Sequence, residues 1–242
     1  MGRANRTRLL GHIVLGLAIL CAGIMARNDL ESWSDEPSER QVAPAEVADV
    51  DGHVYSTVTI GDQVWMAENL RVVRYRDGTA IPHVRGTPEW SGLTTGAYCL
   101  PEHDPAAQSD RYGVLYNFHA TQDSRGLCPG GWHVPTAEEW RSLIDRLGGT
   151  ESAGGRMKDT SSGLWRVVVP GTTNDSGFSA LPAGGRGQFG SAAEVGYFAT
   201  WWSSTPSDAD GAWHWGLYPE KSSIRSNPGH RSSGFSVRCV RD

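Results

Sequence analysis

Short apolar runs separated by turn-forming residues make up most of this chain and restrict it to folds built from short strands. From Val50 onward, Gly, Pro, Asn, Asp and Ser break these runs at intervals of about 8–12 residues. The 242-residue sequence contains 30 Gly and 13 Pro, which excludes a coiled coil or helical bundle. Its 10 Trp and net charge of -5 exclude a disordered chain over most of the length. We therefore predict an α+β domain of short strands, one or two helices and much irregular chain.

Turn residues also indicate where the strands lie. Asp51-Gly52 and Gly61-Asp62 flank an alternating segment, and the residues that follow complete a hairpin. The strands predicted along the chain are residues 53–60, 63–67, 71–75, 178–181, 197–203, 212–218, 222–226 and 235–240.

A helix is predicted directly after Thr136. The threonine suits the N-cap position, and Glu139 three residues later completes a capping box. Gly148-Gly149 provides a C-terminal stop, and a second helix is predicted within residues 153–158. Between cap and stop, apolar residues recur at helical spacing, namely Trp140, Leu143, Ile144 and Leu147.

The N-terminus predicts export. Residues 1–8 carry three arginines and no acid, and residues 9–26 form an 18-residue apolar run. We predict a hydrophobic helix at residues 1–26 that acts as a membrane anchor or a signal segment. Three fates stay open: retention as an anchor, cleavage after Ala26, and lipidation at Cys21.

An acidic tether is predicted at residues 27–47, where acids and two prolines occur without apolar periodicity. The positive-inside rule then places the domain, residues 48–242, outside the cytoplasm, at a cell surface or in a periplasm. The membrane is a predicted partner through the N-terminal segment. No basic stripe stands out among 22 basic and 27 acidic residues, so nucleic acid is not expected as a partner.

The exported part contains Cys99, Cys128 and Cys239. In an oxidising compartment one pair should form a disulfide, and the sequence alone leaves the pairing open. We favour Cys128–Cys239, because it ties the helix region to the final strand across a long loop. Such a loop corresponds to about 4–5 kcal/mol of chain entropy. None of these pairs has the C-x-x-C spacing typical of zinc sites.

Seven motifs occur in order along residues 47–242. They are residues 50–55 (VDGHVY), 61–70 (GDQVWMAENL), 96–99 (GAYC), 112–117 (YGVLYN), 127–140 (LCPGGWHVPTAEEW), 202–205 (WSST) and 234–242 (GFSVRCVRD). Together they resemble the Fibrobacter succinogenes major paralogous domain. The resemblance implies an exported bacterial surface domain. It implies no biochemical activity, because the family has none established.

A second resemblance bears on the fold. Residues 134–140 and 234–239 are similar to segments of formylglycine-generating enzymes, which implies a C-type-lectin-like fold. The copper chemistry of those enzymes uses two neighbouring cysteines upstream of the final strand. No cysteine lies between Cys128 and Cys239, which argues against that activity. The same fold also carries sugar-binding and protein-binding modules, so it does not by itself give a function.

A binding face is predicted in the C-terminal third. Strand alternation places Trp213, Trp215 and Leu217 on one face, which we expect to be core. The residues expected to be exposed for ligand binding are His214, Tyr218, Ser223, Arg225 and Asn227. The predicted function is non-catalytic binding of a polysaccharide or a surface protein by this hairpin region.

The alternatives are a structural or adhesive surface component and, third, an enzyme of unknown reaction. No catalytic residues are assigned, since neither G-x-S-x-G nor H-E-x-x-H occurs. Asp208 and Asp210 are candidate calcium ligands, because oxygen ligands on a flexible loop suit that ion. A solvated acidic loop is the favoured interpretation, so no cofactor is expected apart from possible calcium.

Overall fold

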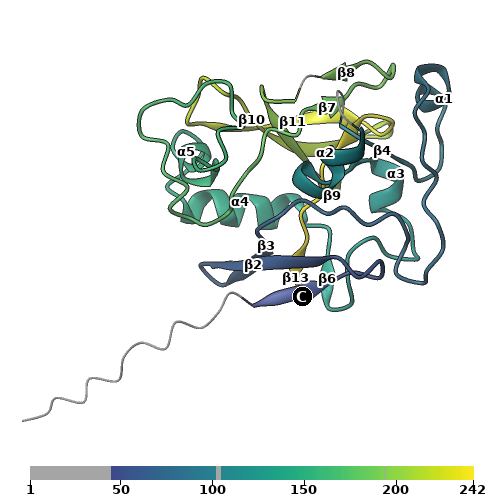
Figure 1. Cartoon of the computed structure of the whole chain (residues 1–242), viewed down its shortest axis with the longest axis horizontal. Coiled ribbons are helices and arrows are strands. Elements are labelled where there is room, and N and C mark those ends of the chain that lie inside the picture. The colour runs from purple at the N-terminus through teal and green to yellow at the C-terminus, as the bar shows by residue number, and fades with distance from the viewer. Residues whose placement is uncertain (1–44, 102–104, 194) are drawn as a thin grey trace, which may run out of the picture. The chain divides into compact units, whose positions relative to one another are not determined.

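The computed structural model describes residues 45–101, 105–193 and 195–242 (Figure 1). The predicted membrane segment, most of the tether and Cys21 lie outside these residues. Within the described chain, no helix is long and apolar enough to cross a membrane. Short helices accompany strands in three antiparallel sheets, which confirms the mixed α+β prediction.

Most of the regular structure is strand. The strands are β1 (Glu46–Ala48), β2 (Val54–Ile60), β3 (Gln63–Met66), β4 (Tyr98–Cys99), β5 (Leu115–Asn117), β6 (Trp132–His133), β7 (Gly185–Arg186), β8 (Ala192–Ala193), β9 (Ala199–Pro206), β10 (Gly211–Leu217), β11 (Ile224–His230), β12 (Gly234–Phe235) and β13 (Val240–Arg241). The helices are α1 (Thr87–Ser91), α2 (Pro105–Tyr112), α3 (Phe118–Thr121), α4 (Ala137–Arg146) and α5 (Ala153–Met157). The sheet orders are β1-β2-β3-β13-β6, β4-β5-β12-β7-β8 and β11-β10-β9.

The predicted helix α4 begins as expected at a capping box. The Thr136 hydroxyl accepts from the backbone N–H of Glu139, whose carboxylate accepts in turn from the Thr136 N–H at 2.7 Å. The helix buries Trp140, Leu143 and Ile144. It packs against β9 and β10, where it contributes to a core of stacked aromatic rings.

Tryptophan dominates that core. The Trp140 ring lies parallel to Trp215 at a centroid distance of 5.6 Å and contacts Trp65 at 5.0 Å. Phe178 and Trp201 complete the group. Because Trp65 lies in β3 and Trp215 in β10, these rings join two sheets through one helix.

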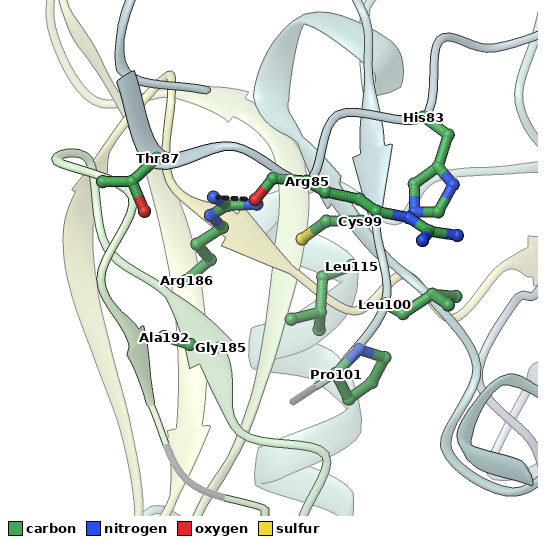
Figure 2. Close-up of a pocket in the computed structure, with 10 residues that line it drawn as sticks. All are labelled: His83, Arg85, Thr87, Cys99, Leu100, Pro101, Leu115, Gly185, Arg186 and Ala192. Carbon is green, nitrogen blue, oxygen red and sulfur yellow. Dashed lines mark hydrogen bonds between the residues drawn. The ribbon is translucent and has the colours of Figure 1, made fainter. Parts of the chain in front are cut away.

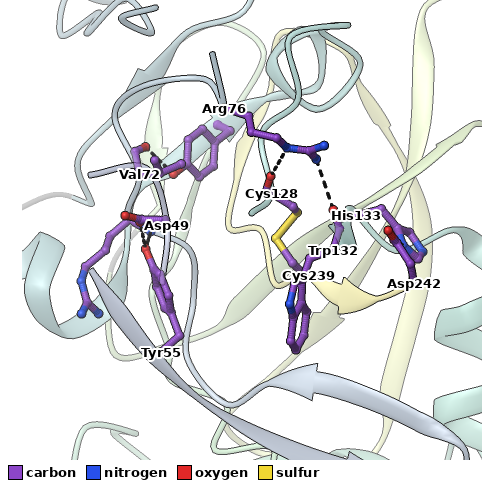
Figure 3. Close-up of a disulfide and its surroundings, with 11 residues drawn as sticks. Asp49, Tyr55, Val72, Arg76, Cys128, Trp132, His133, Cys239 and Asp242 are labelled. Carbon is purple, nitrogen blue, oxygen red and sulfur yellow. Dashed lines mark hydrogen bonds and ion pairs between the residues drawn. A yellow bond between two sulfur atoms is a disulfide. The ribbon is translucent and has the colours of Figure 1, made fainter. Parts of the chain in front are cut away.

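A disulfide joins Cys128 to Cys239, as favoured from the sequence (Figure 3). It links the loop before β6 to the residue before β13. Beside it, Arg76 donates to the carbonyl oxygen of Cys128 at 3.0 Å and to that of Trp132 at 3.4 Å. Disulfides persist in oxidising compartments, so the bond indicates an extracytoplasmic location.

Several predicted strands are not regular strands. Residues 71–75 and 178–181 form only isolated bridges, Arg74 with Ala80 and Ala180 with Lys158. Residues 235–240 divide between β12 and β13, because the backbone between them bonds to several different segments. Short-range alternation does not reveal such long-range partners.

The domain begins earlier than the predicted boundary at residue 48. β1 starts at Glu46 and pairs with β2, with Glu46 opposite Ser56 and Val47 opposite Tyr55. The last residues of the predicted tether therefore form an edge strand of the first sheet.

We expect the disulfide to contribute strongly to stability. Its half-cystines are 111 residues apart, and a loop of that length restricts the unfolded chain by roughly 4–5 kcal/mol. The double variant Cys128→Ser/Cys239→Ser should unfold at lower urea concentration by an amount equivalent to about 2–5 kcal/mol. Reductant should destabilise the wild type to the same level and leave the variant unchanged. Equal midpoints for oxidised and reduced wild type would contradict the expectation.

Candidate functional site

An open, largely apolar hollow lies at one end of the three-stranded sheet. Its volume is about 520 Å³. The side chains of Tyr197 and Tyr218 are 38% and 39% exposed, so their rings are accessible from solvent. The residues that line the hollow are Tyr197, Phe198, Tyr218, Pro219, Glu220 and Lys221.

The register of β9 and β10 brings these aromatic residues together. Ala199 at the start of β9 lies opposite Leu217 at the end of β10. Residues just before β9 and just after β10 therefore leave the sheet at the same end. Phe198 and Tyr218 are accordingly close, with ring centroids 6.4 Å apart.

Cationic groups lie beside both exposed tyrosines. The guanidinium carbon of Arg166 is 4.4 Å from the ring centroid of Tyr197, and Arg166 donates to the Tyr197 hydroxyl at 3.0 Å. The Nζ of Lys221 lies 6.0 Å from the ring centroid of Tyr218. With the carboxylate of Glu220, the hollow combines aromatic faces with charged hydrogen-bonding groups.

A buried lysine holds the segment that carries Tyr218. Lys158 follows α5 and has no exposed surface. Its ammonium donates to the carbonyl oxygens of Tyr218, Pro219 and Lys221, the last two at 3.2 and 2.7 Å. Burial lowers the pKa of Lys158 to about 8.

Three of the five residues predicted to bind ligand are exposed, and one of these lines the hollow. Tyr218 is the lining residue, whereas Arg225 and Asn227 lie along β11 outside it. Arg225 forms an ion pair with Glu151 at 2.9 Å. Both partners are exposed, and such pairs contribute about 0–1 kcal/mol.

The expectation that Ser223 is exposed is wrong, because its side chain is 5% exposed. The segment around it packs against α5. The backbone N–H of Gly155 donates to the Ser222 carbonyl at 2.9 Å, and that of Ile224 donates to the Thr150 carbonyl at 2.8 Å. Both bonds cross between segments that the strand pattern does not connect.

His214 does not lie on an open surface either. Its ring packs at 4.5 Å from Phe235 and 6.1 Å from Trp202. A Cβ at Gly229 on the neighbouring strand would lie 2.9 Å from the His214 ring, so only glycine fits there. Burial lowers the pKa of His214 to about 4, although a hydrogen bond to the Asn227 backbone opposes the shift.

The sequence interpretation gave no ligand role to the other residues of this region. They are Lys158, Arg166, Tyr197, Phe198, Pro219, Glu220 and Lys221. Pairing the predicted strands 197–203 and 212–218 as antiparallel neighbours would have placed Tyr197 near Tyr218. No motif or periodicity marks Lys158, because its carbonyl partners are some 60 residues away.

The calcium candidates lie in the turn between β9 and β10. An Asp208 carboxylate oxygen accepts from the backbone N–H of Asp210 at 2.9 Å, which closes the turn. Both residues are exposed. They do not belong to a set of three converging His, Cys or carboxylate ligands among the described residues.

One such set occurs elsewhere, at Asp49, Asp51 and His53, whose potential ligand atoms lie within 4.8 Å of one another. Its carboxylates already have partners. Asp49 accepts from the Tyr55 hydroxyl, and Asp51 accepts from Arg74. These contacts explain the cluster as a support for the loop between β1 and β2.

A smaller pocket of about 190 Å³ lies beside β4, β5 and β7 (Figure 2). Arg186 is its best-buried cation, at 6% exposure. Its guanidinium donates to the carbonyls of Val84, Arg85 and Gly190 at 3.0, 2.9 and 3.1 Å. The Arg186 guanidinium therefore holds the backbone before α1 in place. For this reason we place the candidate site at the hollow rather than at this smaller pocket.

The Fibrobacter succinogenes major domain matches this chain over residues 58–241. No curated protein and no solved structure matches the chain. The hollow lies within the matched region, and the name of the matching domain implies no specific function.

We expect His214 to make the domain less stable in acid. Its folded pKa of about 4 lies below the ordinary 6.5, so the unfolded chain takes up the proton first as the pH falls. The associated stability is present above pH 6.5 and is lost toward pH 4, by roughly 2–3 kcal/mol. Urea unfolding of His214→Leu should therefore depend less on pH between 7.5 and 4.5 than that of the wild type. Asn227→Leu, at the opposite position on β11, is the control, and equal pH dependence of His214→Leu and wild type would contradict the assignment.

Proposed function

The chain belongs to the Fibrobacter succinogenes major domain family, and since that membership implies no activity, we propose a function from the hollow: non-catalytic binding of polysaccharide. The domain would act outside the cytoplasm, at the bacterial surface, in keeping with its disulfide. The observation that carries the proposal is the pair of half-exposed tyrosines, Tyr197 and Tyr218, beside charged side chains.

The chemistry of the hollow suits a sugar ring. The apolar faces of pyranose rings stack on aromatic side chains, and Tyr197, Phe198 and Tyr218 present such surfaces around one opening. Glu220 and Lys221 supply an acceptor and a donor for hydroxyl groups at the edge of a stacked ring. An apolar floor with a few polar groups is the common design of small-ligand sites.

The residues that line the hollow favour binding over hydrolysis. Glycoside hydrolysis generally requires two carboxyl groups on either side of the scissile bond. Among the described residues that line the hollow, Glu220 is the single carboxylate. This lining therefore suits holding a stacked sugar better than it suits two-carboxylate hydrolysis.

We also propose that the architecture is C-type-lectin-like. Short antiparallel strands, the helix α4 packed on β9 and β10, and a disulfide that ties the final strand to the helix region support this assignment. The hollow lies where the chain enters β9 and leaves β10. The fold alone does not establish the ligand, so the proposal depends on the tyrosines.

A glycan array of the full chain tests the proposal. We expect retention of a subset of oligosaccharides and a loss of about two- to tenfold in affinity for Tyr218→Ala and for Tyr197→Ala, because ring stacking contributes ~0.5–1.5 kcal/mol. The matched control is Phe189→Ala, which removes a ring that is 75% exposed but does not line the hollow.

Retention that survives both tyrosine substitutions would refute the assignment of the hollow. A folded protein that binds no glycan would refute polysaccharide binding, and a protein ligand or a structural role would then be the better explanation. Running the array with calcium and with chelator also tests Asp208 and Asp210, since a calcium requirement would give them a ligand role.

A further inference from the structure

The chain contains two lysines, and both lie at the segment that carries Tyr218. All other basic side chains apart from histidine are arginine, among 22 Lys and Arg in total. Lys221 lines the hollow on its solvent side. Lys158 approaches the same segment from the protein interior and contacts three of its carbonyl oxygens.

The geometry at Lys158 suits an ammonium group. An ammonium has three N–H donors on one atom, whereas a guanidinium spreads five donors over a plane. The three acceptors, the carbonyls of Tyr218, Pro219 and Lys221, belong to one tight segment and meet at one nitrogen. The ring of Trp165 lies 4.8 Å from the same nitrogen and faces the charge.

No carboxylate of the described chain neutralises Lys158. The neighbouring acid Asp159 accepts from Ser161 and Ser162, and Glu220 is exposed. The cations of the packed segments are engaged elsewhere, Arg166 with Tyr197 and Lys221 with the ring of Tyr218. The carbonyl oxygens and the Trp165 ring are therefore the groups that stabilise the buried charge.

We propose that Lys158 is a positioning residue of the hollow, whose ammonium fixes residues 218–221 so that the Tyr218 ring is presented to ligand, and whose deprotonation loosens that segment. The effect of Lys158 on ligand binding rests on the proposed function. The order of residues 218–221 can be measured without a ligand.

The protonation state of Lys158 is what can change in this arrangement. Burial lowers the pKa of Lys158 to about 8, while the three carbonyl oxygens favour the charged form. A neutral amine has two N–H donors, so deprotonation leaves at least one carbonyl without its bond and removes the attraction to the others. The free energy of unfolding of the whole domain depends on pH in the opposite direction. Because the pKa of Lys158 is lower in the folded than in the unfolded chain, deprotonation of Lys158 does not destabilise the whole domain.

Selective labelling of lysine gives a direct test in the full chain. A protein labelled with 15N- and 13C-lysine has two backbone amide signals and two Cε signals, from Lys158 and Lys221. The Lys221 amide donates to the Tyr218 carbonyl, so its hydrogen-exchange protection reports the order of the segment. We expect Lys158→Met to lower this protection at least tenfold at pH 7, by more than any fall in the free energy of unfolding of the whole domain accounts for.

Arg156→Met is the matched control. Arg156 lies in α5, two residues before Lys158, and its guanidinium pairs with Asp175 at the surface. This variant should leave Lys221 protection unchanged. In the wild type, the Lys221 protection, corrected for the intrinsic pH dependence of exchange, should fall as the pH rises. The midpoint of this fall should equal the midpoint at which the Lys158 Cε signal titrates. The fall should be absent in Lys158→Met. Unchanged protection in Lys158→Met, or a pH step that persists in it, would overturn the inference.

The glycan array separates this inference from the proposed function. Oligosaccharides retained by the wild type should be bound several-fold more weakly by Lys158→Met at pH 7. Loss of Lys221 protection together with a blank array for the wild type would support positioning by Lys158 and refute polysaccharide binding. Equal glycan retention by wild type and Lys158→Met would refute the positioning role while leaving polysaccharide binding intact.

Discussion

Buried cations that bind backbone carbonyls hold the irregular parts of this fold together. Lys158, Arg186 and Arg238 are 0%, 6% and 0% exposed. Each donates to carbonyl oxygens of segments outside the sheets and lies over at least one aromatic ring. A chain with so much irregular structure leaves carbonyls without ladder partners, and each would cost free energy if buried unpaired. One cationic side chain satisfies two or three of them at once.

Arg238 shows how this arrangement shapes the core. Its guanidinium donates to Asn69 at 3.0 Å and to the carbonyls of Phe178 and Ser179, with the Phe178 ring 4.1 Å away. Burial lowers its pKa to about 9, so it keeps its charge at neutral pH. Because these carbonyls accept from a side chain, residues 178–181 need no ladder and do not form the predicted strand. The same cation places Phe178 among the core tryptophans.

Sequence patterns within a few residues were sufficient to predict the elements whose stabilising contacts are also local. The capping box at Thr136 gave helix α4, and turn residues gave the hairpin of β2 and β3. The disulfide joins residues 111 apart, and the sequence favoured this pairing without determining it. The remaining features depend on contacts between distant residues. Ser223 is buried by α5, and the partners of Lys158 follow it by some 60 residues. Tyr218 was predicted from strand alternation and its place at the proposed hairpin, whereas Tyr197 required the register between two strands.

In the hollow, the backbone is held by contacts that do not involve the tyrosine side chains, and the tyrosine rings lie at the surface. Tyr197 and Tyr218 lie just outside β9 and β10, half-exposed, so a change of either ring alters surface contacts and leaves the tryptophan core intact. Their placement comes from the Ala199–Leu217 register and from the carbonyl bonds of Lys158, neither of which involves the tyrosine side chains. If the hollow binds ligand as proposed, ligand preference can vary with the residues at 197, 198 and 218, while the sheet and the buried ammonium of Lys158 hold the backbone that presents them.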